Sequence, residues 1–270
     1  IFAMNFSENF AGSPSAVSSV KRVGFLGCGT IGKALVAHLS ERTDAEVAFI
    51  QAPHYEKSPQ ARYPVVRACD EALLKRTDLV VECANAQVLS DNLEAVLRHC
   101  DLLPFSVTAF ADREFEAQAK ALCREHGRHI YLPHGAISGL DGIFDGRSCW
   151  EKVTVETQKS PKSLGRDDAE TAVLYDGPPR EACRLFPRNV NVHAAVALAG
   201  LGFDRTFSRI VSVPGKTSND HLITLEGAGV RFQISVSSHA AGQISGKYTP
   251  LSACGSLDRA LGRGWGMENV

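Results

Sequence analysis

The stretch VGFLGCGTIG, residues 23–32, decides the fold of this chain. Its first four residues predict a short buried strand, and the apolar residues that follow the glycines recur at helical spacing. Gly27 permits a tight turn out of the strand, Gly29 lets the backbone approach a pyrophosphate, and Gly32 lets the helix pack close to the sheet. A free helix N-terminus at this point favours phosphate binding. The residues predicted to bind a dinucleotide here are Gly27, Gly29, Thr30, Ile31 and Gly32.

Strands and helices alternate on the C-terminal side of this stretch. Their ordered succession predicts an α/β fold with an N-terminal Rossmann domain, a doubly wound parallel sheet. The further strands are expected at 46–50, 78–83, 102–107 and 129–132, and the helices at 88–99 and 115–126.

The pattern changes after about residue 135. Period-two alternation predicts half-solvated strands, and their proximity to one another favours a largely antiparallel sheet in a second, α+β domain. The strands are expected at 152–158, 208–213, 222–226 and 230–237, with a helix at 191–201 and a tail helix at 251–261 that returns to the first domain. The predicted division is a flexible N-terminal segment 1–20, a dinucleotide-binding domain 21–134 plus 246–270, and a substrate, catalytic and dimerisation domain 135–245.

Composition excludes several classes of function. The 29 basic and 30 acidic residues give a formal net charge of −1, so no electrostatic footprint for nucleic acid or an anionic membrane is present. No apolar run approaches the roughly 18 residues of a membrane-spanning helix. The eight cysteines form no CxxC pair and no zinc-type spacing, which favours free thiols in the cytoplasm and predicts no metal site.

The choice between NAD and NADP stays open. Rossmann domains that prefer NAD carry an acidic residue at the end of the second strand, which binds the ribose 2′-hydroxyl. Here residues 49–54 run FIQAPH, without a carboxylate. His54 and Lys57 are either candidates for contact with a 2′-phosphate or solvated loop residues.

Several motifs together resemble the L-aspartate dehydrogenase family. They are GCGTIG at 27–32, DLVVECA at 78–84, GAISGLD at 135–141, RLFPRNVNV at 184–192 and ALAGLGFDRT at 197–206. The resemblance covers roughly residues 21 to 262, and its second-domain motifs are the more specific. It implies reversible, NAD(P)-dependent oxidative deamination of L-aspartate, through iminosuccinate, to oxaloacetate and ammonia.

The resemblance also implies roles for individual residues. His221 lies where the family has its catalytic histidine, while Ala136 and Asn191 lie where the family contacts the cofactor. A histidine suits imine hydrolysis because its ordinary pKa is near neutrality. Asn191 is also suited to cap the helix that follows it, a role compatible with contact to the cofactor, and His193 is interpreted as structural. The expected partners are a small-molecule substrate and, by analogy with similar folds, a second copy of the chain.

The sequence departs from the family pattern at three positions, Thr108, Phe110 and His134. Because they follow strands whose carboxyl ends face the cofactor crevice, they motivate an alternative: a dehydrogenase or imine reductase for a different amino acid. A non-catalytic dinucleotide-binding redox sensor is a third hypothesis. A dicarboxylate substrate needs cationic partners, and the sequence offers four without selecting among them: Lys159, Lys162, Arg205 and Lys247.

Overall fold

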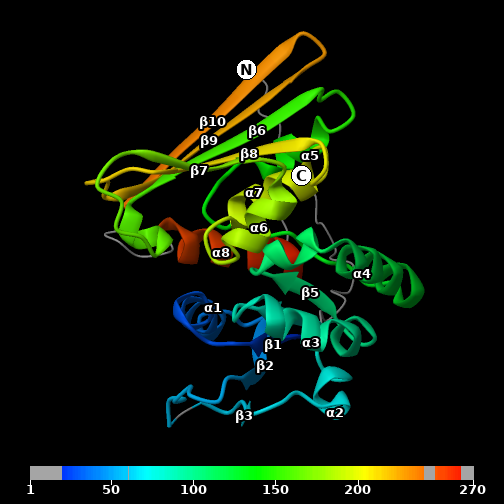
Figure 1. Cartoon of the computed structure of the whole chain (residues 1–270). Coiled ribbons are helices and arrows are strands. Elements are labelled where there is room, and N and C mark those ends of the chain that lie inside the picture. The colour runs from blue at the N-terminus through cyan, green and yellow to red at the C-terminus, as the bar shows by residue number, and fades with distance from the viewer. Residues whose placement is uncertain (1–19, 60, 240–246, 263–270) are drawn as a thin grey trace, which may run out of the picture.

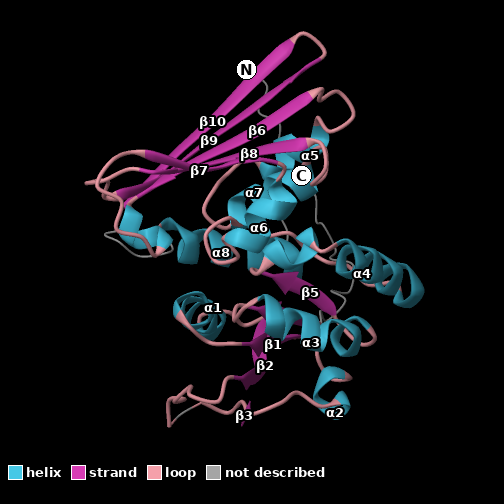
Figure 2. Cartoon of the chain, viewed as in Figure 1, coloured by secondary structure: helices cyan, strands magenta, loops and turns pink. Residues whose placement is uncertain are grey.

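The computed structural model describes residues 20–59, 61–239 and 247–262. It contains two five-stranded sheets, with helix α8 between them (Figures 1 and 2). The strand order is β3-β2-β1-β4-β5 in the first sheet and β10-β9-β6-β8-β7 in the second. The predicted N-terminal segment 1–20 lies, apart from Val20, outside the described residues, as does part of 246–270.

The first sheet is entirely parallel, as the strand–helix alternation predicts. Its central strands are apolar on both faces because helices cover both, so Phe25, Phe49 and Val80 are all fully buried. The order reverses between β1 and β4, which opens a crevice at their carboxyl ends. The elements are β1 (Lys21–Leu26), α1 (Thr30–Ser40), β2 (Ala45–Gln51), β3 (Val65–Val66), α2 (Glu71–Leu74), β4 (Leu79–Glu82), α3 (Ala86–Leu97), β5 (Asp101–Pro104), the 3₁₀ helix η1 (Val107–Ala111) and α4 (Arg113–His126).

Two strand predictions in this half need correction. The stretch 129–132 forms only an isolated parallel bridge between Ile130 and Leu102, because Pro133 follows and has no N–H with which to extend the ladder. The strand expected over 102–107 ends at Pro104. Beyond it the backbone N–H of Ser106 donates to the Glu82 carboxylate, which turns the chain into η1.

The second sheet is mixed, with β6 and β8 parallel and the other pairs antiparallel. One face packs against α7, where Val155, Ile223 and Val196 share a core. The opposite face leaves Phe207 and Leu222 exposed. The elements are α5 (Leu140–Asp145), β6 (Lys152–Lys159), the 3₁₀ helix η2 (Pro161–Leu164), β7 (Ala172–Gly177), α6 (Pro179–Leu185), α7 (Asn191–Ala199), β8 (Thr206–Ser212), β9 (Ser218–Gly227) and β10 (Val230–His239).

The tail helix α8 (Tyr248–Leu261) returns to the first half of the chain, as predicted. Its Leu257 is fully buried in a cluster with Leu35 of α1. Asp258 accepts a hydrogen bond from Arg42 and lies 2.8 Å from Nε2 of His38, so polar contacts flank the apolar ones. These contacts place α8 over the first sheet and below the second (Figure 1).

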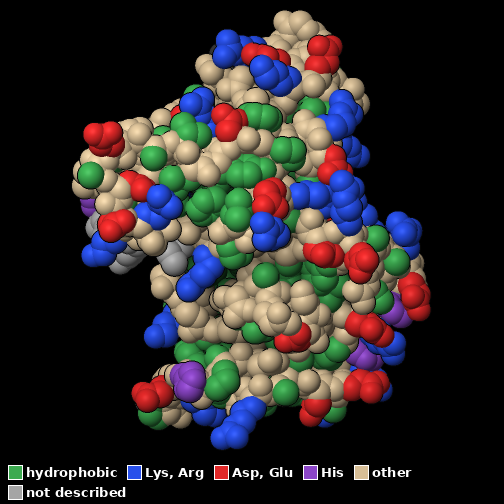
Figure 3. Space-filling view, in the orientation of Figure 1, with side chains coloured by type: hydrophobic (Ala, Val, Ile, Leu, Met, Phe, Trp, Pro, Cys, Tyr) green, Lys and Arg blue, Asp and Glu red, His purple; other side chains and the backbone are tan. Residues whose placement is uncertain are grey.

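Acidic and basic side chains are interspersed over the face in Figure 3, in keeping with the formal net charge of −1. None of the helices in the described part of the chain is long and apolar enough to cross a membrane.

Candidate functional site

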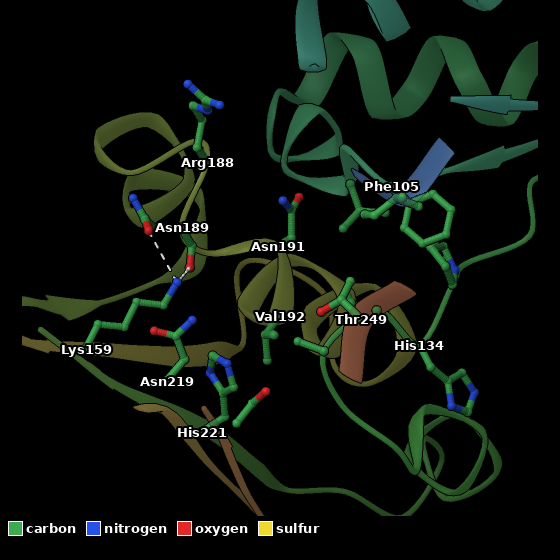
Figure 4. A pocket seen from close by; sticks show the side chains of 17 residues that line it. Phe105, His134, Lys159, Arg188, Asn189, Asn191, Val192, Asn219, His221 and Thr249 are labelled. Atoms are coloured by element: carbon green, nitrogen blue, oxygen red, sulfur yellow. Dashed lines mark hydrogen bonds between the residues drawn. The ribbon is translucent and has the colours of Figure 1, made fainter. Parts of the chain in front are cut away.

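A cavity of about 90 Å³ lies between the two sheets. Its walls come from the start of α1, the loop after β5, the connection 133–136, both β9 and β10, and the helices α7 and α8. It brings together four of the predicted site residues, Ile31, Ala136, Asn191 and His221 (Figure 4).

A second cavity, of about 660 Å³, borders the other side of the glycine turn. Gly27 lines it, together with Gln51 at the end of β2 and Ala84 after β4. Three basic side chains also line it, Lys33, His54 and Arg67, beside one carboxylate, Glu56. Lys57 is not among its lining residues and instead donates from Nζ to the carbonyl of Tyr63.

The glycine turn between the cavities has the geometry that phosphate binding requires. Gly27 has a φ of +89°, and a Cβ there would lie 2.7 Å from Cβ of Ala84. A Cβ on Gly29 would meet nothing within 4 Å, so the space above this residue is open. Gly32 packs closely, because a Cβ there would lie 3.0 Å from Sγ of Cys83. No side chain caps the start of α1 at Gly29, which leaves its N-terminal N–H groups to a ligand.

The buried carboxylate of Glu82, which was not predicted from the sequence, joins the segments that follow β4 and β5. Oε1 of Glu82 accepts from the N–H of Ala84 (2.7 Å) and from Oγ of Ser106 (2.9 Å), and Oε2 accepts from the N–H of Ser106 (3.0 Å). Glu82 is fully buried, and burial raises the pKa of its carboxyl group. These bonds tie the carboxyl ends of β4 and β5 together under the cavities.

His221 projects into the first cavity from β9. Alternation along β9 places it on the buried face with Asn219 and Ile223, and the side chain is 4% exposed. Burial, with a smaller contribution from the charge of Lys159, lowers the pKa of the imidazole to about 3, while Asp220 opposes the shift. The ring is therefore neutral near pH 7 and has a lone pair with which to accept a proton.

Lys159 lies at the end of β6 and lines the same cavity. It is 3% exposed, and its Nζ lies 3.3 Å from both the carbonyl oxygen and Oδ1 of Asn189 (Figure 4). Burial lowers the pKa of its ammonium group to about 8. Of the other three candidate cations, Lys162 and Lys247 are exposed, and Arg205 lines a hollow on the outer face of the second sheet. Lys159 is thus the candidate that the fold selects.

Asn191 joins the two halves of the chain. Its Oδ1 accepts from the backbone N–H of Thr108 (3.2 Å), and the Thr108 hydroxyl donates to the carbonyl of Pro187 (3.0 Å). The helix-capping role that was also predicted for Asn191 is wrong, because the capping position of α7 is Val190 and no side chain caps the helix.

The three departures from the family pattern have different surroundings. Thr108 is buried in the contact just described, and the buried ring of Phe110 lies 5.2 Å from that of Phe115. Neither is among the residues that line the first cavity, whereas His134 is. The His134 ring lies across the cavity from Lys159 and His221 in Figure 4, and burial lowers the pKa of its imidazole.

Some cavity residues were not predicted from the sequence: Phe105, Arg188, Asn189, Asn219, Ser238 and Thr249. A pattern in the sequence was available for two of them. Asn219 lies two residues before His221 on an alternating strand, and hence on the same face. Asn189 lies two residues before Asn191, in the motif at 184–192. No local pattern distinguishes Thr249, which reaches the cavity only because α8 packs back on the fold.

Comparison with known proteins matches both halves of the chain. The family model "Aspartate dehydrogenase, C-terminal" matches residues 145–260, and "Homoserine dehydrogenase, NAD binding domain" matches residues 27–133. The L-aspartate dehydrogenase of Methanococcoides burtonii is 34% identical over 76% of this chain and 83% of its own length. That of Archaeoglobus fulgidus is 37% identical over 66% of this chain and 71% of its own. The crystal structure of aspartate dehydrogenase from Thermotoga maritima superposes with a TM-score of 0.72 at 26% identity, covering 89% of this chain and 95% of that one.

Proposed function

Because the chain belongs to the L-aspartate dehydrogenase family, we propose that it catalyses the reversible, NAD(P)-dependent oxidative deamination of L-aspartate. The products are oxaloacetate and ammonia, formed through iminosuccinate. The observation that carries the proposal is the first cavity, in which a neutral buried histidine and a buried lysine lie beside an open glycine turn.

The residues around the glycine turn fit NAD or NADP. Gly27, Gly29, Thr30 and Gly32 would hold the pyrophosphate at the start of α1, and Ile31, Ala136 and Asn191 would adjoin the nicotinamide in the first cavity. When bound, the cofactor supplies the acceptor for the hydride from Cα of the substrate. The second cavity would receive the adenosine end, where Lys33, His54 and Arg67 suit a 2′-phosphate as well as a hydroxyl.

Lys159 would bind the substrate, and His221 would transfer protons. Lys159, with the exposed Arg188 at the cavity wall, binds substrate carboxylates through charge-assisted hydrogen bonds. As water attacks the imine carbon, His221 accepts the proton that the water loses, and it later returns that proton to the departing amine nitrogen. After this proton transfer the imidazolium of His221 is stabilised, because the substrate carboxylates offset the positive charge of Lys159.

The glycine turn provides a test of the cofactor assignment that does not depend on turnover. Gly29→Ala is expected to leave the melting temperature unchanged, since its Cβ meets no protein atom within 4 Å, but to weaken NADH binding by occupying the pyrophosphate space. The matched variant Gly27→Ala is expected to lower both the melting temperature and the affinity for NADH. A side chain is strained at a φ of +89°, and the new Cβ would collide with Ala84. Fluorescence titration with NADH and thermal unfolding measure the two effects. Undiminished affinity in Gly29→Ala would place the dinucleotide elsewhere.

Residues 135–245, proposed as the substrate-binding and catalytic domain, would also form the interface of a homodimer. The outer face of the second sheet exposes Phe207 and Leu222, and beside them Arg209 lies 3.8 Å from Glu156 and 3.9 Å from Asp176. Apolar side chains flanked by both signs of charge can pair with a copy of themselves across a two-fold axis. The eight cysteines, all free thiols, support a reducing compartment such as the cytoplasm.

The deciding experiment is reductive amination with oxaloacetate and ammonia, followed by the loss of NADH or NADPH absorbance beside a panel of other keto acids. Turnover with oxaloacetate is the expected result, and the two cofactors compared in parallel give the preference. Activity on a different keto acid alone would favour the alternative substrate, with His134 as the first residue to test. Tight cofactor binding without turnover on any keto acid would favour a redox sensor.

A further inference from the structure

A chain of four buried polar side chains runs from the first cavity into the core of the second sheet. Nδ1 of His221 lies 2.8 Å from Oγ1 of Thr157, and the same hydroxyl lies 2.6 Å from Nε2 of His193. Nδ1 of His193 in turn lies 2.8 Å from Oγ of Ser208. The chain crosses β9, β6, α7 and β8, and His193 and Ser208 are both fully buried.

The sheet register explains why these groups meet. Thr157 and His221 are direct partners in the antiparallel β6–β9 ladder, and Ser208 pairs with Val155, two residues before Thr157 on the same face. His193 projects from α7 onto this face, where it contacts Thr157 and Ser208. Both of its ring nitrogens lie within hydrogen-bond distance of a hydroxyl, so its burial leaves neither unsatisfied.

The Thr157 hydroxyl restricts how protons can be arranged along the chain. It has one hydrogen, so it can donate to only one of the two imidazoles, and the other must donate to it. Each neutral ring carries one N–H. A donor order that satisfies all three bonds is His221 Nδ1–H to Thr157, Thr157 to His193 Nε2, and His193 Nδ1–H to Ser208. The reverse order would put the hydrogen of His221 on Nε2, the nitrogen left for a substrate.

The charge in the cavity distinguishes these two orders. The Lys159 ammonium lines the same cavity as His221. A positive charge favours a lone pair over an N–H on the ring nitrogen that faces the cavity. The first order, with Nε2 unprotonated, is therefore preferred, and it is the one that supplies a base.

We propose that Thr157, His193 and Ser208 are positioning residues that hold His221 as its Nδ1–H tautomer, with the unprotonated Nε2 directed at the substrate. The proposal rests on the catalytic role proposed above for His221. It explains why a histidine interpreted from sequence as merely structural, His193, has both nitrogens engaged in a buried chain. It also assigns a mechanistic role to the Thr157 hydroxyl.

The first test reads the tautomer directly in the native protein. Nitrogen-15 NMR separates protonated from unprotonated ring nitrogens, and the spectrum of His221→Gln identifies which signals belong to His221. We expect Nδ1 protonated and Nε2 unprotonated near neutral pH. A native ring protonated at Nε2 would overturn the proposal. This result needs no turnover, so it stands apart from any failure of the proposed activity.

The second test compares Thr157→Val, which keeps the shape of the side chain but removes the hydroxyl, with Thr157→Ser, which keeps the hydroxyl. We expect Thr157→Val to lower kcat for aspartate by about tenfold or more, as loss of an orienting partner does, with little change in KM. Thr157→Ser is expected to restore most of the rate. A wild-type kcat in Thr157→Val would contradict the proposal.

The pH profile separates positioning from a purely structural role. The Nδ1–H bond to Thr157 stabilises the protonated ring, so its removal lowers the pKa of His221 and moves the acid limb of the kcat profile to lower pH. The charged and titratable groups around the ring are Lys159 from β6, Asp220 from β9 and His193 from α7, and all three remain in Thr157→Val. An unshifted limb in Thr157→Val would overturn the proposal.

Discussion

Replacing His221 with alanine is expected to lower kcat for aspartate roughly 10²-fold or more, the usual contribution of a general acid–base. The side chain is 4% exposed in the cavity, and burial holds the pKa of its ring at about 3, so the native enzyme presents a neutral base near pH 7. Steady-state kinetics in both directions measure the loss. NADH affinity is expected to stay close to wild type, since the glycine turn is untouched.

His129 provides a matched control for this variant. Its side chain is 71% exposed and stacks on Tyr131, and it is not among the residues that line the first cavity. His129→Ala is expected to retain wild-type kinetics. If His221→Ala turned over aspartate as fast as His129→Ala, His221 would have no part in the mechanism.

Replacing Lys159 with methionine is expected to make the protein more stable and much less active. The pKa of the buried ammonium is about 8 instead of 10.5, a difference equivalent to about 3 kcal/mol against the charged form in the folded state. Methionine has similar volume and no charge. Because the hydrogen bonds to Asn189 are lost as well, we expect the free energy of unfolding to rise by less than that amount.

The same variant is expected to lower kcat/KM for aspartate roughly 10- to 100-fold, the effect of removing one charged hydrogen bond to a carboxylate. Lys162→Met, three residues away and exposed, is the matched control and is expected to change neither property. Unimpaired use of aspartate by Lys159→Met would show that another group binds the substrate carboxylates.

The stability difference should also depend on pH. Below pH 8 Lys159 is protonated in both folded and unfolded chains, and the native protein bears the full cost of the buried charge. Between about 8 and 10.5 only the unfolded chain holds the proton, so native stability rises with pH relative to Lys159→Met. Denaturant unfolding of both proteins across this range is expected to show that the difference in their free energies of unfolding becomes smaller as the pH rises. A difference in unfolding free energy that did not change with pH would mean that burying the charged ammonium does not destabilise the native protein.

Local periodicity explains which parts of the molecule were predictable. The spacing of apolar residues within one short stretch predicts the β1–α1 unit and the alternating strands β6, β9 and β10. The helix α7 follows instead from a nearly continuous apolar run. The alternation in β6 even places Lys159 on the buried face with Val155 and Thr157, a pattern that would have singled it out from the other candidate cations.

The parts that were not predictable depend on pairing between distant segments. Thr157 and His221 are 64 residues apart and meet only because β6 and β9 are neighbours in register. The Glu82 carboxylate meets Ser106 only where β4 pairs with β5. The apolar periodicity of one strand does not predict which residues of another strand it will contact. The resemblance to a known family supplied His221 and Asn191, but not the residues that surround them.

The position of α8 has a consequence for how the enzyme is made. The ribosome synthesises this helix after every other described element, yet its Thr249 lines the cavity and its Leu257 fills the core beside α1. Domains that form during synthesis usually assemble from the N-terminal side. Here the first sheet is synthesised early, but its core is complete only after α8 has been synthesised and has packed on α1. A nascent chain stalled before Tyr248 would therefore expose apolar surface on α1 and leave the cavity open, a state for chaperones to protect.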